Sequence, residues 1–266
     1  MLLALFSVAG SPGVSTLALG LAAHWPAPQR ALLVEADASG GDLAKLFALP
    51  TTPGLLTLTT AAHAVSDPDL VWEHSLIVRG GLRAVVAPPD AVRAQATLTR
   101  FLHERGGADL LVEVAEVPGT AVIVDCGRLT PDSPAVDLAC RADVALLLTG
   151  TRTDDMTHLA AARLPVPHPM VLLVGDGHAV KETVRETGIQ PLGSVPDDPR
   201  GAALLRGRRA PFDRDVDGAA ASALGRTAHT IATVLAAHPA PPASTTVPAS
   251  ECGGADDLRP QWKRAC

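Results

Sequence analysis

The sequence predicts a doubly wound α/β fold, in which a mostly parallel sheet carries helices on both faces. Short Val- and Leu-rich runs alternate with helix-like segments along the chain, and such runs are typical of strands covered on both faces. A glycine-containing loop separates the first run from the first helix, and polar or glycine residues follow several later runs. Since ligands of such sheets bind beyond the carboxyl ends of the strands, the fold class also predicts where a site lies.

The predicted strands and helices alternate in chain order, which favours parallel pairing. The strands are residues 2–8, 31–35, 82–86, 121–125, 144–149 and 170–175, with a further strand-like run at 192–195. The helices between them are residues 17–23, 91–104, 108–116, 154–163 and 180–187, the last ending at Gly188 as a C-cap. Residues 50–80 carry a weaker pattern, from which we expect a helical insertion.

The last predicted helix spans residues 218–238 and has one apolar stripe. That stripe consists of Leu224, Ala228, Ile231 and Leu235, at the spacing of a helix that packs on a sheet. Residues 239–266 are small, polar and Pro-rich and cannot bury enough surface to order themselves. We therefore expect one domain at 1–238 and a disordered tail at 239–266.

Composition narrows the classes of function. The 266 residues are 47% hydrophobic but only 3% aromatic, without Tyr, so the core must consist of Ala, Val and Leu. A net charge of −6 gives no electrostatic reason to bind nucleic acid. The four Cys contain no CxxC pair and the nine His show no metal-ligand spacing, which indicates neither a disulfide framework nor a zinc site and fits a cytoplasmic protein.

The first 29 residues carry no charged side chain and imitate a signal peptide or membrane anchor. Three features favour a strand and a helix instead: there is no basic n-region, residues 10–13 break the apolar run, and another strand follows. We therefore assign this segment to the fold.

The loop after the first strand has the character of a phosphate-binding loop. It comprises Gly10, Ser11, Pro12, Gly13, Val14, Ser15 and Thr16. In such loops backbone N–H groups wrap the phosphates, a lysine neutralises their charge, and a Ser or Thr hydroxyl ligates Mg²⁺. Ser15 is placed to be that ligand, but Val14 stands at the lysine position. An ordinary Gly/Pro turn explains these seven residues equally well.

Three further places after predicted strands carry polar residues. Glu35 and Asp37 follow the second strand, where carboxylates can hold metal-bound water or orient a nucleophile; the alternative is a solvated acidic turn. Asp125 ends a buried strand before a glycine, an arrangement suited to Mg²⁺, or else caps a helix. Pro196 and Asp197 lie in a Pro-bounded loop that is more often merely a turn.

Together, in this order, these motifs resemble the ParA/MinD family of deviant Walker A P-loop ATPases, nearest to its TadZ/CpaE-like and actinobacterial MinD-like branches. The family loop K-G-G-x-G-K-[ST]-T followed by an Ala/Leu-rich helix is similar to residues 9–22. That alignment places Val14 at the phosphate lysine and Ala9 at the signature lysine, so both lysines are absent. The other similar segments are residues 32–44, 122–127, 142–149 and 192–200.

The resemblance implies a nucleotide site with ATP or ADP and Mg²⁺ as cofactors. Residues 10–16 would bind the phosphates, Pro196 and Asp197 the adenine side, and Ser15, Asp37 and Asp125 the metal, with the two aspartates also catalytic. It further implies a homodimer and protein partners from a positioning, secretion or pilus machinery. Membrane contact, through the tail around Trp262, is weak at best.

The missing lysines predict weak or no hydrolysis, because each lost charge-assisted donor removes about 2–4 kcal/mol of transition-state stabilisation. Our main hypothesis is therefore a nucleotide-binding positioning, partitioning or scaffold factor. Two alternatives stay open. The first is an active ATPase that uses displaced basic residues, with Arg30, Lys45, Arg79 and Arg200 as candidates. The second is an NAD(P)-dependent oxidoreductase in which Glu35 binds the ribose, although Pro12 occupies the middle glycine of its fingerprint.

Overall fold

The computed structural model describes residues 1–62, 67–104, 106–176, 180–207 and 218–237. Its eight strands form one sheet in the order β3-β4-β2-β5-β1-β6-β7-β8, in which β3 and β4 pair antiparallel and the other neighbours pair parallel. The strands are β1 Leu2–Ser7, β2 Arg30–Glu35, β3 Leu76–Ile77, β4 Arg83–Val85, β5 Thr120–Arg128, β6 Val144–Gly150, β7 Met170–Val174 and β8 Gly193–Val195. The predicted α/β fold class is confirmed.

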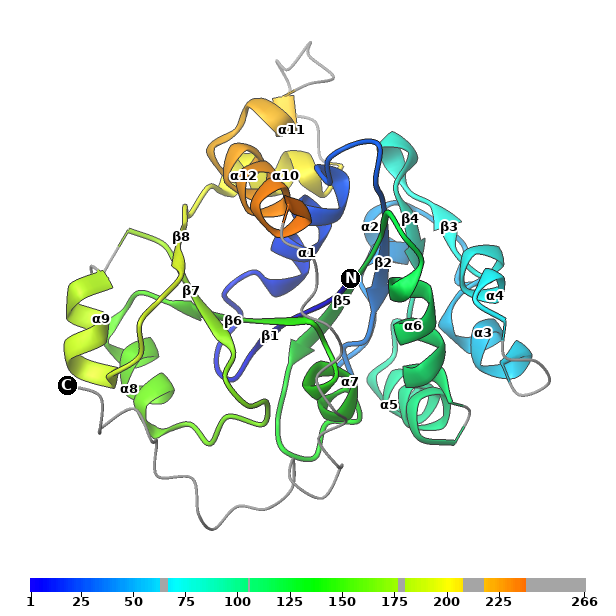
Figure 1. Ribbon diagram of the computed structural model, residues 1–266, viewed down its shortest axis with the longest axis horizontal. Helices are drawn as coiled ribbons and strands as arrows, with labels where there is room; N and C mark the ends of the chain where they lie inside the picture. The colour runs from blue at the N-terminus through cyan, green and yellow to red at the C-terminus, as the bar shows by residue number, and fades with distance from the viewer. Residues whose placement is uncertain (63–66, 105, 177–179, 208–217, 238–266) are drawn as a thin grey trace.

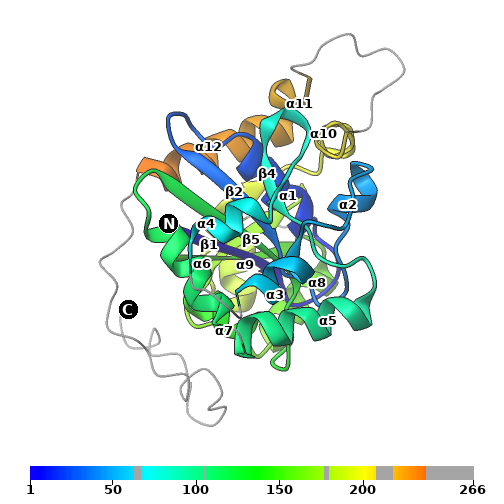
Figure 2. The ribbon, with the colours of Figure 1, turned by 90° about the vertical axis from the view of Figure 1, so that its right-hand side faces the viewer.

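Helices cover both faces of this sheet (Figures 1 and 2). One layer contains α1 Val14–Ala23, α2 Leu43–Leu46, α10 Pro199–Leu205, α11 Gly218–Ala221 and α12 Ala223–Ala237. The remaining helices are α3 Leu55–Ala61, α4 Asp69–Glu73, α5 Ala91–Thr99, α6 Gly107–Glu116, α7 Val136–Cys140, α8 Thr153–Ala161 and α9 Val180–Thr187. A 3₁₀ turn η1 (Arg79–Gly81) precedes β4, and a π-helical turn η2 (Arg100–Glu104) follows α5.

A hydrophobic cluster fills the space on each face of the sheet, and both consist mainly of Ala, Val and Leu as composition predicts. Phe6 and Phe101 are the largest fully buried side chains and lie in the same cluster, on the face of α5 and α6. On the other face α1 is almost wholly buried. None of the helices in the described part of the chain is both long and apolar enough to cross a lipid bilayer.

The final helical segment differs from its prediction. Residues 218–238 were expected to be one helix on the sheet, but the segment breaks at Ser222, whose hydroxyl accepts a hydrogen bond from the Gly225 N–H (2.9 Å). α12 then packs chiefly against α1, where a Cβ at Gly20 would lie 3.2 Å from the Ala228 Cβ. The absence of a side chain at Gly20 thus lets two helices stack above the sheet.

Other helix boundaries also differ from the predicted ones. The predicted helix 91–104 is α5 followed by the π turn η2, and the insertion at 50–80 contains the helices α3 and α4 together with the short strand β3, which the sequence pattern did not show. The predicted C-cap is confirmed, since Gly188 has φ 70° and donates to the Val184 carbonyl (2.8 Å). The predicted disordered tail lies outside the described residues.

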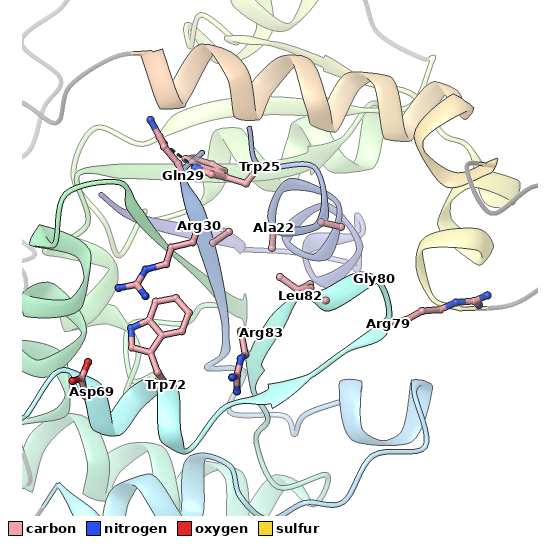
Figure 3. Close-up of a pocket in the computed structure, with 13 residues that line it drawn as sticks. Ala22, Trp25, Gln29, Arg30, Asp69, Trp72, Arg79, Gly80, Leu82 and Arg83 are labelled. Atoms are coloured by element: carbon pink, nitrogen blue, oxygen red, sulfur yellow. Dashed lines mark hydrogen bonds between the residues drawn. The ribbon is translucent and has the colours of Figure 1, made fainter. Parts of the chain in front are cut away.

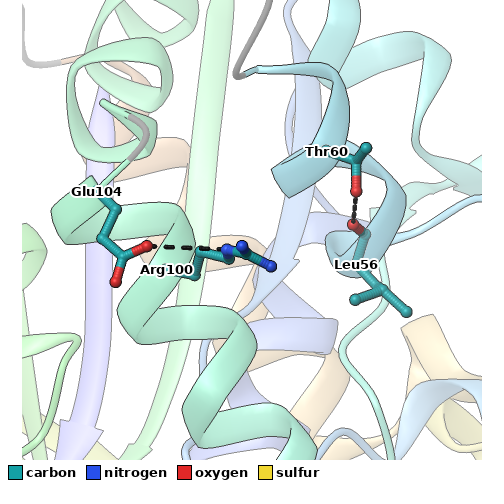
Figure 4. Close-up of polar contacts among 4 residues, drawn as sticks. All are labelled: Leu56, Thr60, Arg100 and Glu104. Carbon is teal, nitrogen blue, oxygen red and sulfur yellow. Dashed lines mark hydrogen bonds and ion pairs between the residues drawn. The ribbon is translucent and has the colours of Figure 1, made fainter.

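Local contacts lie on the outer surface of the layer that contains α3 and η2 (Figure 4). Arg100 and Glu104 form an ion pair at 3.7 Å with side chains about three-fifths exposed, and the Thr60 hydroxyl donates to the Leu56 carbonyl at 3.2 Å. Exposed pairs one helical turn apart contribute only about 0.3–0.5 kcal/mol. The stability of this layer therefore comes from its buried face.

Candidate nucleotide-binding site

The glycine loop lies at the carboxyl end of β1 and opens directly into α1. Gly10 and Gly13 have φ 65° and 96°, a left-handed conformation that glycine adopts at no steric cost. A Cβ at Gly10 would meet no atom within 4 Å, so the space beyond the loop is open. Gly13 is the N-cap of α1, and no side chain caps that end. The first N–H groups of α1 are therefore available to an anion.

The Val14 side chain, which stands at the lysine position, is packed into the hydrophobic core. Its side chain is 6% exposed and belongs to the hydrophobic cluster on the α1 face. The position is therefore filled by core packing. Among the described residues, the cation that hydrogen-bonds to this loop is Arg206, which follows α10 and donates to the Thr16 hydroxyl oxygen at 2.6 Å. Sequence spacing gave no signal for this contact, because 190 residues separate the two side chains.

Asp125 lies beside the loop, as predicted. β5 pairs with both β1 and β2, with Asp125 in register with Leu5 and Glu35. Its side chain is 4% exposed, receives a hydrogen bond from the Ser15 side chain, and accepts one from the Gly127 N–H (3.0 Å). Burial raises the pKa of Asp125 to about 6 despite these two hydrogen bonds. The structure therefore brings together two of the three predicted metal ligands.

Asp37 is the third predicted ligand and lies against the end of β5. A Cβ at Gly127 would fall 2.0 Å from the Asp37 Oδ2 atom, and Gly127 has φ 57°. The glycine therefore makes room for the carboxylate. Burial raises the pKa of Asp37, opposed by hydrogen bonds from Ser39, whose N–H donates at 2.7 Å. The charges of Asp37 and Asp42 also raise the pKa of Asp125.

Glu35 has a structural role that the sequence did not reveal. Its carboxylate is 3% exposed and accepts three backbone hydrogen bonds, from Asp42 (2.7 Å), Leu43 (2.9 Å) and Ala87 (3.0 Å). Burial raises the pKa of Glu35 to about 7, against the lowering effect of these bonds. Because both oxygens are engaged inside the protein, Glu35 ties the loop after β2 to the end of β4 and is not presented to a ribose. This geometry opposes the oxidoreductase alternative.

Pro196 and Asp197 follow β8, the edge strand of the sheet. The Asp197 side chain is exposed, and no described interaction joins either residue to the glycine loop, so their predicted contact with a nucleotide stays a prediction. The neighbouring Asp198 is structural: its carboxylate accepts from the N–H groups of Gly201 (2.8 Å) and Leu224 (3.1 Å). The Gly201 N–H bond is the main reason that the pKa of Asp198 is lowered.

The basic residues predicted as substitutes for the lysine lie elsewhere. The Arg30 guanidinium stacks on Trp72 at 4.3 Å from the ring centroid. Arg30 is the first residue of β2, so it lies at the amino-terminal ends of the strands, whereas the glycine loop lies at their carboxyl ends. Arg79 donates to the Gly207 carbonyl (3.4 Å). Lys45 is exposed on α2, and Arg200 is exposed in the first turn of α10. Among the described residues, neither Arg30 nor Arg79 contacts the glycine loop, whereas Arg206, the neighbour of Gly207, does.

The donors at the loop suit Mg²⁺. A hydroxyl and two carboxylates, from Ser15, Asp37 and Asp125, are hard oxygen ligands, and Mg²⁺ typically takes one or two carboxylates while keeping water. Burial is the main cause of the raised pKa of both aspartates, and a bound cation would favour their charged forms. Within the described ranges no group of three or more His, Cys, Asp or Glu side chains is placed to bind a metal.

A mostly parallel sheet with a glycine loop between β1 and α1 is an arrangement found in α/β folds that bind phosphate groups at a helix N-terminus. Solved structures place the chain more closely: it has the fold of ParA and MinD ATPases. A ParA family ATPase from Chlorobium tepidum superposes with a TM-score of 0.68 at 16% identity, covering 87% of this chain and 98% of that one.

Two MinD structures show the same likeness. The septum site-determining protein MinD from Pyrococcus horikoshii, complexed with Mg-ADP, has a TM-score of 0.60 at 15% identity over 88% of this chain and 95% of that one. MinD in the MinC:MinD complex of Aquifex aeolicus has a TM-score of 0.60 at 14% identity over 90% and 97%. No protein-family model and no curated protein matches the sequence.

Proposed function

We propose that this chain is a ParA/MinD-like nucleotide-binding protein whose phosphate loop works without lysine, and that it acts as a cellular positioning, partitioning or scaffold factor with weak or no ATP hydrolysis. The observation that carries the proposal is the combination at the carboxyl end of β1. Hydroxyl and carboxylate groups for a metal–phosphate complex stand beside an uncapped helix N-terminus, while Val14 is packed into the core.

Binding would rest on the backbone and the metal ligands. The N–H groups at the start of α1 would contact phosphate oxygens, and Ser15, Asp37 and Asp125 would hold Mg²⁺, which neutralises phosphate charge when it is bound. Asp37, half-buried beside Gly127, is the carboxylate that could orient a water molecule. Pro196 and Asp197 remain our proposal for the adenine side.

Weak hydrolysis follows from the same geometry. Phosphoryl transfer depends on positive charge that is already in place around the phosphate oxygens. Val14 and Ala9 supply no positive charge, and the Val14 side chain is buried in the core. The chain would therefore bind a nucleotide more readily than it turns it over.

Two proteins of similar fold bind a partner protein and a nucleotide, respectively. One MinD of the same fold forms a complex with MinC, and another binds Mg-ADP. By this analogy we propose a homodimer in the cytoplasm that engages protein partners of a positioning, secretion or pilus machinery. Nucleic acid is not indicated by the net charge of −6.

The proposal is tested by calorimetric titration of the full chain with ATP and ADP, with Mg²⁺, beside a phosphate-release assay. Saturable binding with little or no phosphate release is expected, and Ser15→Ala should weaken binding by removing a metal ligand. A Val14→Lys variant tests the missing ammonium: if it still folds, it should release phosphate faster than the natural chain. Turnover by the natural chain at the rate of lysine-bearing ATPases would overturn the proposal.

A second candidate, an active ATPase with a displaced cation, is favoured by one contact. Arg206 reaches the Thr16 hydroxyl at 2.6 Å, and a guanidinium can bind phosphate in two-pronged geometry. If Arg206 replaces the lysine, Arg206→Ala should abolish phosphate release and Arg206→Lys should keep part of it. Arg226→Ala, an exposed arginine on α12, is the matched control.

A further inference from the structure

A cavity lies at the amino-terminal ends of the strands, whereas the glycine loop lies at their carboxyl ends. Its volume is about 640 Å³, within the range of about 300–1,000 Å³ of small-molecule sites. It is open to solvent on one side and is lined by the amino-terminal residues of β2 and β4, the last residues of α1, the helix α4 and the turn before β4 (Figure 3). Since each strand residue advances about 3.3 Å, the six residues of β2 place the two sites roughly 20 Å apart.

The cavity is positively charged in an acidic protein. Arg30, Arg79 and Arg83 line it, with Asp69 as the acid among its lining residues. The ion pairs of the described residues are Arg100–Glu104 and Arg141–Asp109, so none of these three arginines has a carboxylate partner there. Arg79 points out of the cavity toward α10 (Figure 3), which leaves Arg30 and Arg83 as its positive charges and Asp69 as its negative one.

Arg30 is held in place on one side only. Its guanidinium stacks on the Trp72 ring at 4.3 Å, and its Nε atom donates to the Thr120 hydroxyl oxygen at 3.2 Å. No hydrogen bond is found from its two terminal nitrogens to any described residue. A guanidinium that is stacked and anchored through Nε keeps its two-pronged edge for an anion.

Arg83 is anchored differently, through one of its terminal nitrogens. Its Nη1 atom donates to the carbonyl and the hydroxyl of Ser75 at 3.5 and 3.4 Å, and no described residue accepts from Nη2. Figure 3 shows Arg30 and Arg83 on two sides of the Trp72 ring. Two guanidinium groups therefore lie beside one aromatic ring, each with nitrogen atoms from which no described residue accepts a hydrogen bond.

Apart from the charged residues and Gln29, the lining consists of tryptophan and small or apolar residues. Trp25 lines the cavity, with its indole N–H donating to the Gln29 side-chain oxygen at 3.0 Å. Trp25 and Trp72 are two of only three tryptophans in the chain. Trp25 is half-buried against the cluster on the α1 face, and the part of its ring that lines the cavity can pack against a flat group.

We propose that this cavity binds a small planar organic phosphate, of the class of nucleoside monophosphates, without a metal ion. Arg30 and Arg83 bind the phosphate, and the indole rings of Trp25 and Trp72 pack against the planar group. The site is separate from the glycine loop and does not depend on the function proposed for that loop.

The test is a fluorescence titration of the full chain carrying Trp262→Phe, so that only Trp25 and Trp72 emit. AMP is added in the presence of EDTA, which removes the Mg²⁺ that the glycine loop requires. Saturable quenching is expected. Adenosine supplies the ring without the charge and inorganic phosphate the charge without the ring, so each should bind at least tenfold more weakly than AMP.

Variants assign the signal to the cavity. Arg30→Ala and Arg83→Ala should each raise the dissociation constant for AMP at least tenfold, whereas Arg100→Ala, a surface arginine with an exposed partner, should leave it unchanged. Arg30→Lys keeps the charge without the two-pronged edge and should fall between. Circular dichroism shows whether each variant is folded, and Arg83→Ala carries the test if Arg30→Ala is not.

The proposal is overturned if AMP gives no saturable quenching up to about 1 mM, the range of weak binding. It is also overturned if folded Arg30→Ala and Arg83→Ala chains bind AMP as tightly as the parent chain. Loss of the signal in Ser15→Ala would assign the binding to the glycine loop and refute a second site.

Discussion

Replacing Asp125 with Asn should stabilise the fold at neutral pH while weakening the metal site. Burial raises the pKa of Asp125 from 3.8 to about 6, and a pKa difference of one corresponds to about 1.4 kcal/mol. Keeping this group ionised in the fold therefore costs about 3 kcal/mol at pH values above 6. An Asn can still accept from Gly127 and bond with Ser15, so the substitution removes the charge without stranding a polar group.

The sign of the pH dependence follows from linkage. Between the unfolded pKa of 3.8 and the folded pKa of about 6, the folded chain binds more protons than the unfolded chain, so this group makes stability fall as pH rises. The cost is complete above the folded pKa and absent below the unfolded one. Asp125→Asn should thus be more stable than the natural chain by up to about 3 kcal/mol at pH 7.5, and by less than about 1 kcal/mol at pH 4.

Urea denaturation of both chains at the two pH values measures this difference, with Asp109→Asn, an exposed acid, as the control for surface charge. Titration with Mg-ADP on the same samples should show weaker binding by Asp125→Asn. If Asp125→Asn is less stable than the natural chain at pH 7.5, the hydrogen bonds from Ser15 and Gly127 outweigh burial, and the reasoning about this carboxylate is wrong.

Three other substitutions test the hydrogen bonds and packing that support the site and the hydrophobic core. Glu35→Ala leaves two buried N–H groups and one partly buried N–H group without acceptors, so urea denaturation should show a loss of at least about 2 kcal/mol; an unchanged midpoint would contradict the role given to Glu35. Gly127→Ala places a Cβ against Asp37 at a positive φ, which should destabilise the chain by about 1–3 kcal/mol and weaken Mg-ADP binding; normal values of both would show that the loop yields. Phe6→Ala empties a fully buried position and should lower the free energy of unfolding by about 3–5 kcal/mol, whereas a loss below about 1 kcal/mol would mean that the core closes over the gap.

The sequence predicted the sheet well because its strands are buried on both faces. β1, β2, β5, β6 and β7 each form a run of Val, Leu or Ile that stands out from its surroundings. The two-residue β3 has no such run, since Ile77 is exposed and its pairing depends on β4. The break at Ser222 was missed because the apolar stripe continues past it, and only the cap geometry shows that a new helix begins.

The site was predictable only where it is local in the chain. Ser15, Asp37 and Asp125 end or follow strands, so sheet topology alone brings them to one edge. Arg206 was missed, because its contact with Thr16 depends on how α10 packs on α1. Glu35 was placed at the right edge but with the wrong function, since a sequence does not show which N–H groups a carboxylate will meet.

Metal–nucleotide binding and the stability of the fold depend on each other, because buried carboxylates lie at the glycine loop and Val14 stands at its lysine position. Asp125 and Asp37 are buried or half-buried with raised pKa values, and no lysine stands in the loop to offset them. A metal–nucleotide complex that binds the folded chain supplies the missing positive charge and stabilises the fold in proportion to the logarithm of its concentration. That gain should be larger above pH 6, where Asp125 is ionised, than below it, because only the ionised carboxylate attracts the cation. In this design, Mg²⁺ would take over the neutralising role that an ammonium group has in other phosphate loops.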